Sequence, residues 1–146
     1  MSRAETDPTR RHPPTGHRPR SGVAGCAVRT AADARAVVTE ALARHSAAGG
    51  RLLGDACLAV TELVTNAIRH AGGVTGFAAR ASEGGSVLTI EIEDACDAHP
   101  RGDRANLQDP TLLGGRGWPL VQLVATEWEI HPLPGGGKRI RVVLTA

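Results

Sequence analysis

The sequence predicts an α+β fold, a two-layer sandwich in which a mixed, mostly antiparallel sheet carries helices on one face. Two patterns predict it. Apolar residues recur with a helical period in some segments and alternate in shorter ones. Most of the strand-like segments also follow one another through turns too short for a parallel crossover, so they should pair antiparallel.

The first half of the folded domain should contain one strand and two helices. A short strand is expected over residues 23–29, followed by a helix that Thr30 caps and that runs to about residue 46. A second helix is expected over residues 52–70, ended by Gly72 and Gly73. Its apolar face comprises Leu53, Ala56, Val60, Leu63, Val64, Ala67 and Ile68.

The second half should contain two hairpins and one more helix. The expected elements are strands over 74–81 and 87–93, a helix over 118–126, and strands over 127–132 and 138–145. Gly-containing turns over 83–86 and 133–137 close the hairpins. Residues 95–114 show no periodicity. Because loops of this length in compact domains are commonly functional, we expect this one to act as a lid over a ligand.

Residues 1–22 should form a disordered basic tail, and residues 23–146 the folded domain. The tail is rich in Pro and Arg and has almost no large apolar side chain, so it cannot offset its ordering entropy. Its five Arg against Glu5 and Asp7 give it a net charge of +3, and because the whole chain carries +2, the domain carries −1. The domain therefore lacks the basic excess that would predict nucleic-acid binding.

Composition also bears on the cellular setting. No apolar run is long enough for a transmembrane helix, and the amino-terminal segment lacks the apolar centre of a secretory signal, so we expect neither a membrane span nor export. The cysteines Cys26, Cys57 and Cys96 are odd in number and lack metal-ligand spacing. They favour a reduced, cytoplasmic protein.

Glu62, Asn66 and His70 recur at four-residue spacing in the second predicted helix. The spacing places Asn66 and His70 roughly 40° and 80° from Glu62 around the helix axis, on the polar border of the apolar face. Polar residues on such a border are usually only solvated. Alternatively, the Asn oxygen is a suitable Mg²⁺ ligand, and a Glu one turn earlier can accept a proton from a hydroxyl or water that attacks a phosphate. The triplet alone leaves both interpretations open.

Two further places could belong to the same site. Asp94 ends an alternating strand, where its carboxylate can accept the N6 amino group of adenine, although an Asp can equally begin a turn there. Gly115, Arg116 and Gly117 precede a helix, whose first N–H groups are suited to phosphate. Arg116 can either reach that phosphate or lie on the surface. In their order along the chain, these signals together predict one nucleotide site.

These motifs resemble those of the GHKL ATPases, the group that includes gyrase and the histidine kinases. The residues that resemble the N box, the first Gly box and the second Gly box of this group are, in that order, Glu62, Asn66 and His70; Asp94; and Gly115 with Gly117. The resemblance covers residues 23–145. Within the group, the chain is most similar to small actinobacterial anti-sigma-factor serine/threonine kinases.

The resemblance implies a Bergerat-type ATP-binding fold that uses ATP and Mg²⁺. It implies an anti-sigma regulator that phosphorylates a Ser or Thr of a small antagonist protein and binds a sigma factor in its alternative partner state. A homodimer is compatible with it.

The resemblance also implies roles for individual residues. Glu62 is then the catalytic base, Asn66 the Mg²⁺ ligand, and Asp94 the acceptor for adenine. Gly115, Arg116 and Gly117 then shape the phosphate end, and His70 lies at the nucleotide without a defined role.

A competing hypothesis is a module that sequesters a partner without phosphoryl transfer. Two departures from the family pattern favour it: Cys96 stands where the first Gly box usually has Gly, and Arg139 where the last strand commonly has Thr. Glu62 and Asn66 oppose it. A fragment of a sensor histidine kinase is disfavoured, because no dimerising helical hairpin precedes residue 23.

Overall fold

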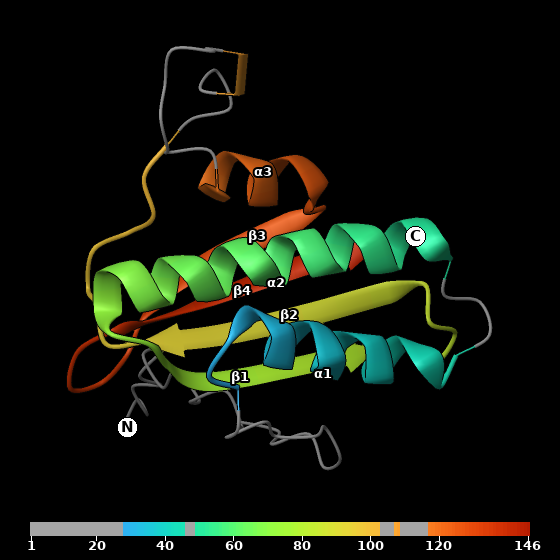
Figure 1. Ribbon diagram of the computed structural model, residues 1–146, viewed down its shortest axis with the longest axis horizontal. Helices are drawn as coiled ribbons and strands as arrows, with labels where there is room; N and C mark the ends of the chain where they lie inside the picture. The colour runs from blue at the N-terminus through green and yellow to red at the C-terminus, as the bar shows by residue number, and fades with distance from the viewer. Residues whose placement is uncertain (1–27, 46–48, 103–106, 109–116) are drawn as a thin grey trace, which may run out of the picture.

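The computed structural model describes residues 28–45, 49–102, 107–108 and 117–146. Within them the chain has the expected α+β architecture, with an open four-stranded sheet in the order β1-β2-β4-β3 and all neighbours antiparallel. The helices gather on one face of this sheet (Figure 1). In chain order the elements are α1 (Ala31–Ala43), α2 (Gly50–Ala71), β1 (Val74–Ala81), β2 (Val87–Asp94), α3 (Gly117–Val124), β3 (Glu127–Pro132) and β4 (Lys138–Thr145).

Some expectations fall outside the described residues. These are the tail over 1–22, most of the strand expected over 23–29, and the parts of the predicted lid over 103–106 and 109–114. The expected mixed sheet is wholly antiparallel in the described part of the chain.

Local sequence signals explain where the helices begin and end. The Thr30 hydroxyl accepts the N–H of Asp33 at 3.1 Å, and the Asp33 carboxylate accepts the N–H of Thr30 at 3.1 Å, which makes a capping box for α1. Helix α2 ends at Gly72, whose φ of 76° is a left-handed conformation that glycine adopts without strain. None of the helices in the described ranges is long and apolar enough to cross a membrane.

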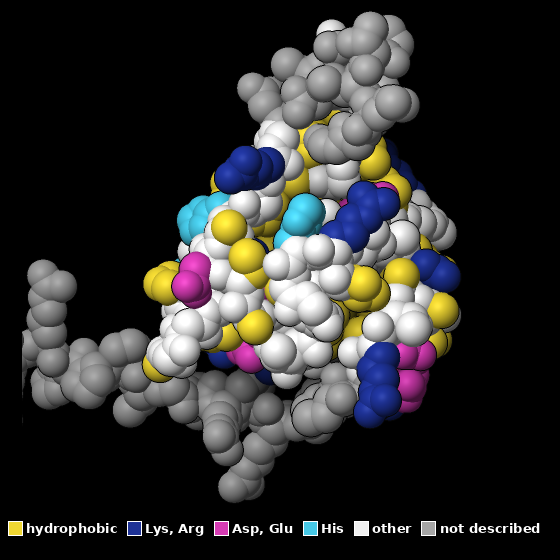
Figure 2. Space-filling view, turned by 60° about the vertical axis from the view of Figure 1, so that its left-hand side comes forward, with side chains coloured by type: hydrophobic (Ala, Val, Ile, Leu, Met, Phe, Trp, Pro, Cys, Tyr) yellow, Lys and Arg dark blue, Asp and Glu magenta, His cyan; other side chains and the backbone are white. Residues whose placement is uncertain are grey.

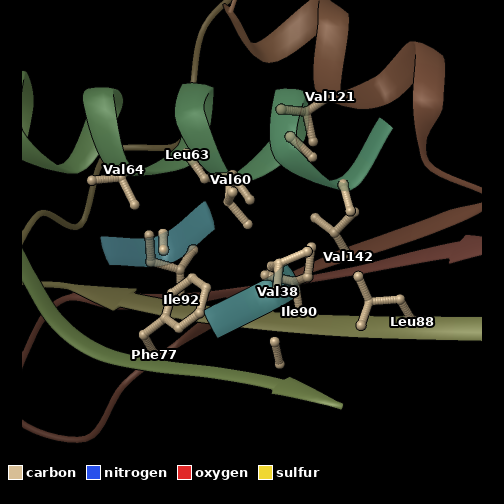
Figure 3. Close-up of a cluster of buried hydrophobic side chains, with 14 of the residues drawn as sticks. Val38, Val60, Leu63, Val64, Phe77, Leu88, Ile90, Ile92, Val121 and Val142 are labelled. Atoms are coloured by element: carbon tan, nitrogen blue, oxygen red, sulfur yellow. The ribbon is translucent and has the colours of Figure 1, made fainter. Parts of the chain in front are cut away.

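The core lies between α2 and the sheet, as Figure 3 shows. The buried residues of α2 are Leu52, Ala56, Ala59, Val60, Leu63, Val64 and Ala67. Ile68 was expected in this face but is 48% exposed, and that expectation is wrong. Ile68 follows the buried Ala67 by about 100° of helical rotation, which takes it past the edge of the stripe that faces the sheet.

The register of β2 and β4 places a charged pair at one end of an apolar row. The cross-strand pairs on the helix-facing side are Leu88 with Leu144, Ile90 with Val142, Ile92 with Ile140, and Asp94 with Lys138. Arg139 belongs to the opposite side, where its Nε donates to Glu93 Oε1 at 2.8 Å. Arg139 therefore points away from the helices, and Lys138 points towards them.

Candidate functional site

A cavity of about 620 Å³ opens between the carboxyl-terminal half of α2, the end of β2 and the starts of α3 and β4. Its volume lies within the range of small-molecule sites. Among the described residues it is lined by Glu62, Leu63, Asn66, Arg69, His70, Asp94, Cys96, Ala98, His99, Pro100, Arg101, Gly117, Trp118, Leu120, Lys138 and Ile140. Figure 2 brings this end of the molecule forward and shows Lys, Arg and His side chains gathered there.

The cavity brings together residues that are far apart in the sequence. Glu62, Asn66 and His70 reach it from α2, Asp94 from the end of β2, and Gly117 from the start of α3. Glu62 and Asn66 are half-buried, whereas His70 is exposed at the rim. Gly115 and Arg116, which were expected at the same site, lie outside the described residues.

Glu62 lies against the amino end of α3. A Cβ on Gly117 would be only 2.5 Å from Glu62 Oε2, so the glycine leaves room for the carboxylate in this position. The first N–H groups of a helix have no partner within the helix, and the helix dipole favours negative charge beside them. Glu62 thus holds an acceptor oxygen at a place where both a carboxylate and a phosphate are electrostatically favoured.

Glu62 and Asn66 supply hard oxygen atoms one helical turn apart. Within the described ranges, no group of three or more His, Cys, Asp or Glu side chains could hold a metal ion. This donor set does not suit zinc, which takes three or four nitrogen or sulfur ligands. The amide oxygen of Asn66 suits Mg²⁺, which is held by one or two protein oxygens together with water and substrate phosphates.

Asp94 is held by a hydrogen-bond network that its sequence context does not predict. Its Oδ1 accepts the Lys138 ammonium at 2.9 Å and the N–H of Cys96 at 2.9 Å, and Lys138 Nζ also donates to the Cys96 carbonyl at 3.0 Å. Both charged side chains are only 7% exposed. The missed signal was the alternation of the last strand, which places Lys138 on the same side as its apolar residues.

Further basic residues of the cavity were also missed. Arg69 lies between Asn66 and His70 on α2, and His99 and Arg101 come from the segment that follows β2. The cationic side chains of Arg69 and Arg101 are suited to the oxygens of a polyphosphate, because the fork of an Arg can donate two parallel bonds. Arg69 follows Asn66 by three residues, and this spacing could have predicted that the two side chains lie next to each other on the helix.

Trp118 anchors α3 over the sheet. It is 4% exposed, lines the cavity, and meets Trp128 of β3 edge to face, with ring centroids 5.1 Å apart and an interplanar angle of 78°. Since Trp118 follows Gly117 directly, this contact helps to fix the amino end of α3 beside Glu62.

A family model described as the histidine kinase-like ATPase domain matches residues 26–144 of the chain. The match spans every residue that lines the cavity. No curated protein matches the chain significantly.

Proposed function

Because the chain belongs to the family of histidine kinase-like ATPase domains, we propose that it binds Mg·ATP and transfers the γ-phosphoryl group to a Ser or Thr of a protein. The observation that supports this most is the convergence of Glu62, Asn66 and Asp94 on one cavity with cationic walls. We assign the protein to anti-sigma regulation, with a small antagonist protein as phosphoacceptor and a sigma factor as the alternative partner. This assignment rests on the resemblance of its motifs to those of anti-sigma-factor kinases.

Each end of the cavity has its own binding task. At the base end, Asp94 accepts the N6 amino group of adenine. At the phosphate end, Asn66 offers its amide oxygen to Mg²⁺, and Arg69 and Arg101 donate to phosphate oxygens. Bound Mg²⁺ neutralises charge on the phosphate oxygens.

Glu62 is the group that moves a proton. As the acceptor hydroxyl oxygen bonds to the γ-phosphorus, Glu62 takes the hydroxyl proton, the bond to the β–γ bridging oxygen breaks, and its electron pair leaves with ADP. Transfer then rests mainly on positioning, which the contact between Glu62 and the start of α3 provides.

The replacement Glu62→Gln tests this role directly. It keeps the size of the side chain but removes the base, so nucleotide binding should persist while transfer falls by about 10²- to 10⁴-fold. Binding is measured by calorimetry, and transfer as γ-labelled phosphate on Ser or Thr of proteins in a native extract.

The control for this test is Glu83→Gln, in the exposed turn between β1 and β2, which should change neither quantity. Transfer at the wild-type rate by Glu62→Gln would contradict the assignment. Loss of nucleotide binding together with transfer would assign Glu62 a structural role instead.

One observation favours a second candidate, a module that sequesters a partner without phosphoryl transfer. The buried Lys138 already occupies an oxygen of Asp94, the expected adenine acceptor. If this pair closes the base end, the wild-type protein binds no nucleotide, and calorimetry with Mg·ATP separates the two candidates.

A further inference from the structure

Asp94 and Lys138 are the only charged residues buried in the described part of the chain, and both line the cavity. Their neighbours along the β2–β4 ladder are apolar pairs, namely Leu88 with Leu144, Ile90 with Val142, and Ile92 with Ile140. The charged pair replaces an apolar pair only at the end of the row that reaches the cavity. Its place in the register therefore links the pair to the cavity rather than to the core.

A purely structural role explains this pair poorly. Removing two charges from water is costly, and well-packed apolar residues in place of a buried ion pair are commonly as stable or more stable. Three such apolar pairs already hold β2 to β4. The chain retains the costly arrangement at the one position where a ligand can use its polar atoms.

The pair presents an unused acceptor beside an unused donor. Asp94 Oδ1 takes both the Lys138 and the Cys96 bonds, and among the described residues no hydrogen bond involves the second oxygen, Oδ2. An ammonium group has three N–H donors. Asp94 and the Cys96 carbonyl account for two of those on Lys138.

We infer that Lys138 is a specificity-determining residue that reads, together with Asp94, the edge of a purine formed by N1 and the substituent at C6. This inference rests on the proposed nucleotide site. In adenine the edge offers a donor, the N6 amino group, to Asp94 and an acceptor, N1, to Lys138. The two contacts are made by adjacent protein groups and need no bridging water.

The same pair admits a 6-oxopurine with the partners exchanged. Guanine and hypoxanthine offer O6 as an acceptor, which Lys138 satisfies, and N1–H as a donor, which Asp94 satisfies. A carboxylate alone would face O6 without a donor and would reject these bases, because an unpaired buried polar group is costly. Lys138 thus relaxes the selectivity for adenine that Asp94 alone would impose.

Calorimetric titration of the full chain with three nucleotides tests this. The ligands are ADP, its 1-deaza analogue, which lacks the N1 acceptor, and inosine diphosphate, which carries O6 and N1–H. The wild type should bind 1-deaza-ADP about tenfold more weakly than ADP, because a hydrogen bond to a charged donor is lost. It should bind inosine diphosphate within about tenfold of ADP.

The variant Lys138→Met should erase the difference between ADP and 1-deaza-ADP and should increase the preference for ADP over inosine diphosphate by about tenfold. Its control is Arg139→Met, which removes a cation one residue away on the opposite face of β4 and should leave both ratios unchanged. Folding of each variant is checked by circular dichroism. If Lys138→Met does not fold, the binding of 1-deaza-ADP and inosine diphosphate to the wild type tests the inference by itself.

Equal binding of ADP and 1-deaza-ADP by the wild type would overturn the inference, as would unchanged ratios in a folded Lys138→Met variant. Either result leaves the nucleotide site standing. A wild type that binds none of the three nucleotides would instead refute the proposed function, and the inference with it.

Discussion

At the scale of single residues, the contact between Glu62 and Gly117 leaves no free space for a side chain at position 117. The carboxylate occupies the space that any side chain at Gly117 would need. The atom that such a side chain would meet first, Glu62 Oε2, is the end of a flexible side chain. A larger residue at position 117 would therefore displace the carboxylate more readily than it would separate α2 from α3. Position 117 therefore controls where the proposed base points.

The replacement Gly117→Ala tests this control. The added Cβ should push the Glu62 carboxylate aside by a fraction of an ångström to an ångström, which is enough to slow transfer by about 100-fold. Thermal unfolding should shift little, since the side chain that must move can rotate. Transfer is measured with γ-labelled ATP.

The matched control is Gly84→Ala, because a Cβ there would meet nothing within 4 Å. It should transfer at the wild-type rate. Full activity of Gly117→Ala would show that the position of Glu62 does not limit the reaction.

Lys138 and Arg139 show that the sequence gives the chemistry of a side chain but not the face of the sheet on which it lies. The chemistry of each is evident, but which one faces the cavity depends on the register of β4 against β2. A shift of one residue would exchange the two faces. In the sequence, Arg139 is the residue that departs from the family pattern. In the structure, Arg139 pairs with Glu93 on the face away from the helices, and Lys138 is the residue that contacts Asp94.

At the scale of elements, α2 carries both the core and the site. Its buried stripe packs on the sheet, and its neighbouring stripe presents Glu62 and Asn66 to the cavity. The helical period of its apolar residues predicted this helix, and Gly72 predicted its end. The sequence did not predict the edge of the buried face, because the positions of α1 and α3 decide how far burial extends. Ile68 lies beyond that edge.

Replacing Val60 and Ile68 in turn by Ala compares a buried with an exposed branched side chain on α2. Val60 is fully buried, so Val60→Ala should lower the free energy of unfolding by about 2 kcal/mol through lost burial and a residual cavity. Ile68→Ala should change it by less than about 0.5 kcal/mol, because the side chain is half exposed. Urea unfolding measures both, and equal losses would contradict the assignment of the buried face.

The capping box of α1 should give a pH-dependent contribution to stability. The N–H groups of Arg29 and then Thr30 donate to the Asp33 carboxylate and lower its pKa from the ordinary value of 3.8. Because the pKa is lower in the folded state, this contribution is present above pH 3.8 and is lost as the pH falls through the folded value.

The variant Asp33→Asn should therefore be less stable than the wild type at neutral pH, and the difference should narrow as the pH falls below 3.8. Urea midpoints measured across this range test the sign. Glu40→Gln, which removes an exposed partner of Arg44 on the same helix, should change stability little at any pH. A difference in stability between Asp33→Asn and the wild type that grew as the pH fell would contradict the capping role.

At the scale of the whole molecule, the two-layer arrangement places the site at one end of the sandwich. The end of β2, the start of β4, the carboxyl-terminal half of α2 and the start of α3 all meet there, although they come from distant parts of the sequence (Figure 1). Motif order along the chain predicted that Glu62, Asn66, Asp94 and Gly117 would converge. The cationic wall from Arg69 and Arg101 required the folded arrangement to become visible.

Calorimetric titration of the wild type and of Asn66→Ala with ATP, each with Mg²⁺ and with a chelator, tests whether the cavity binds Mg·ATP through Asn66. The wild type should bind ATP in a Mg²⁺-dependent manner, and Asn66→Ala should lose that dependence with most of the affinity, because the proposed metal ligand is gone. Circular dichroism confirms that the variant is folded. No binding by the wild type, or binding unchanged in Asn66→Ala, would contradict a Mg·ATP site in this cavity.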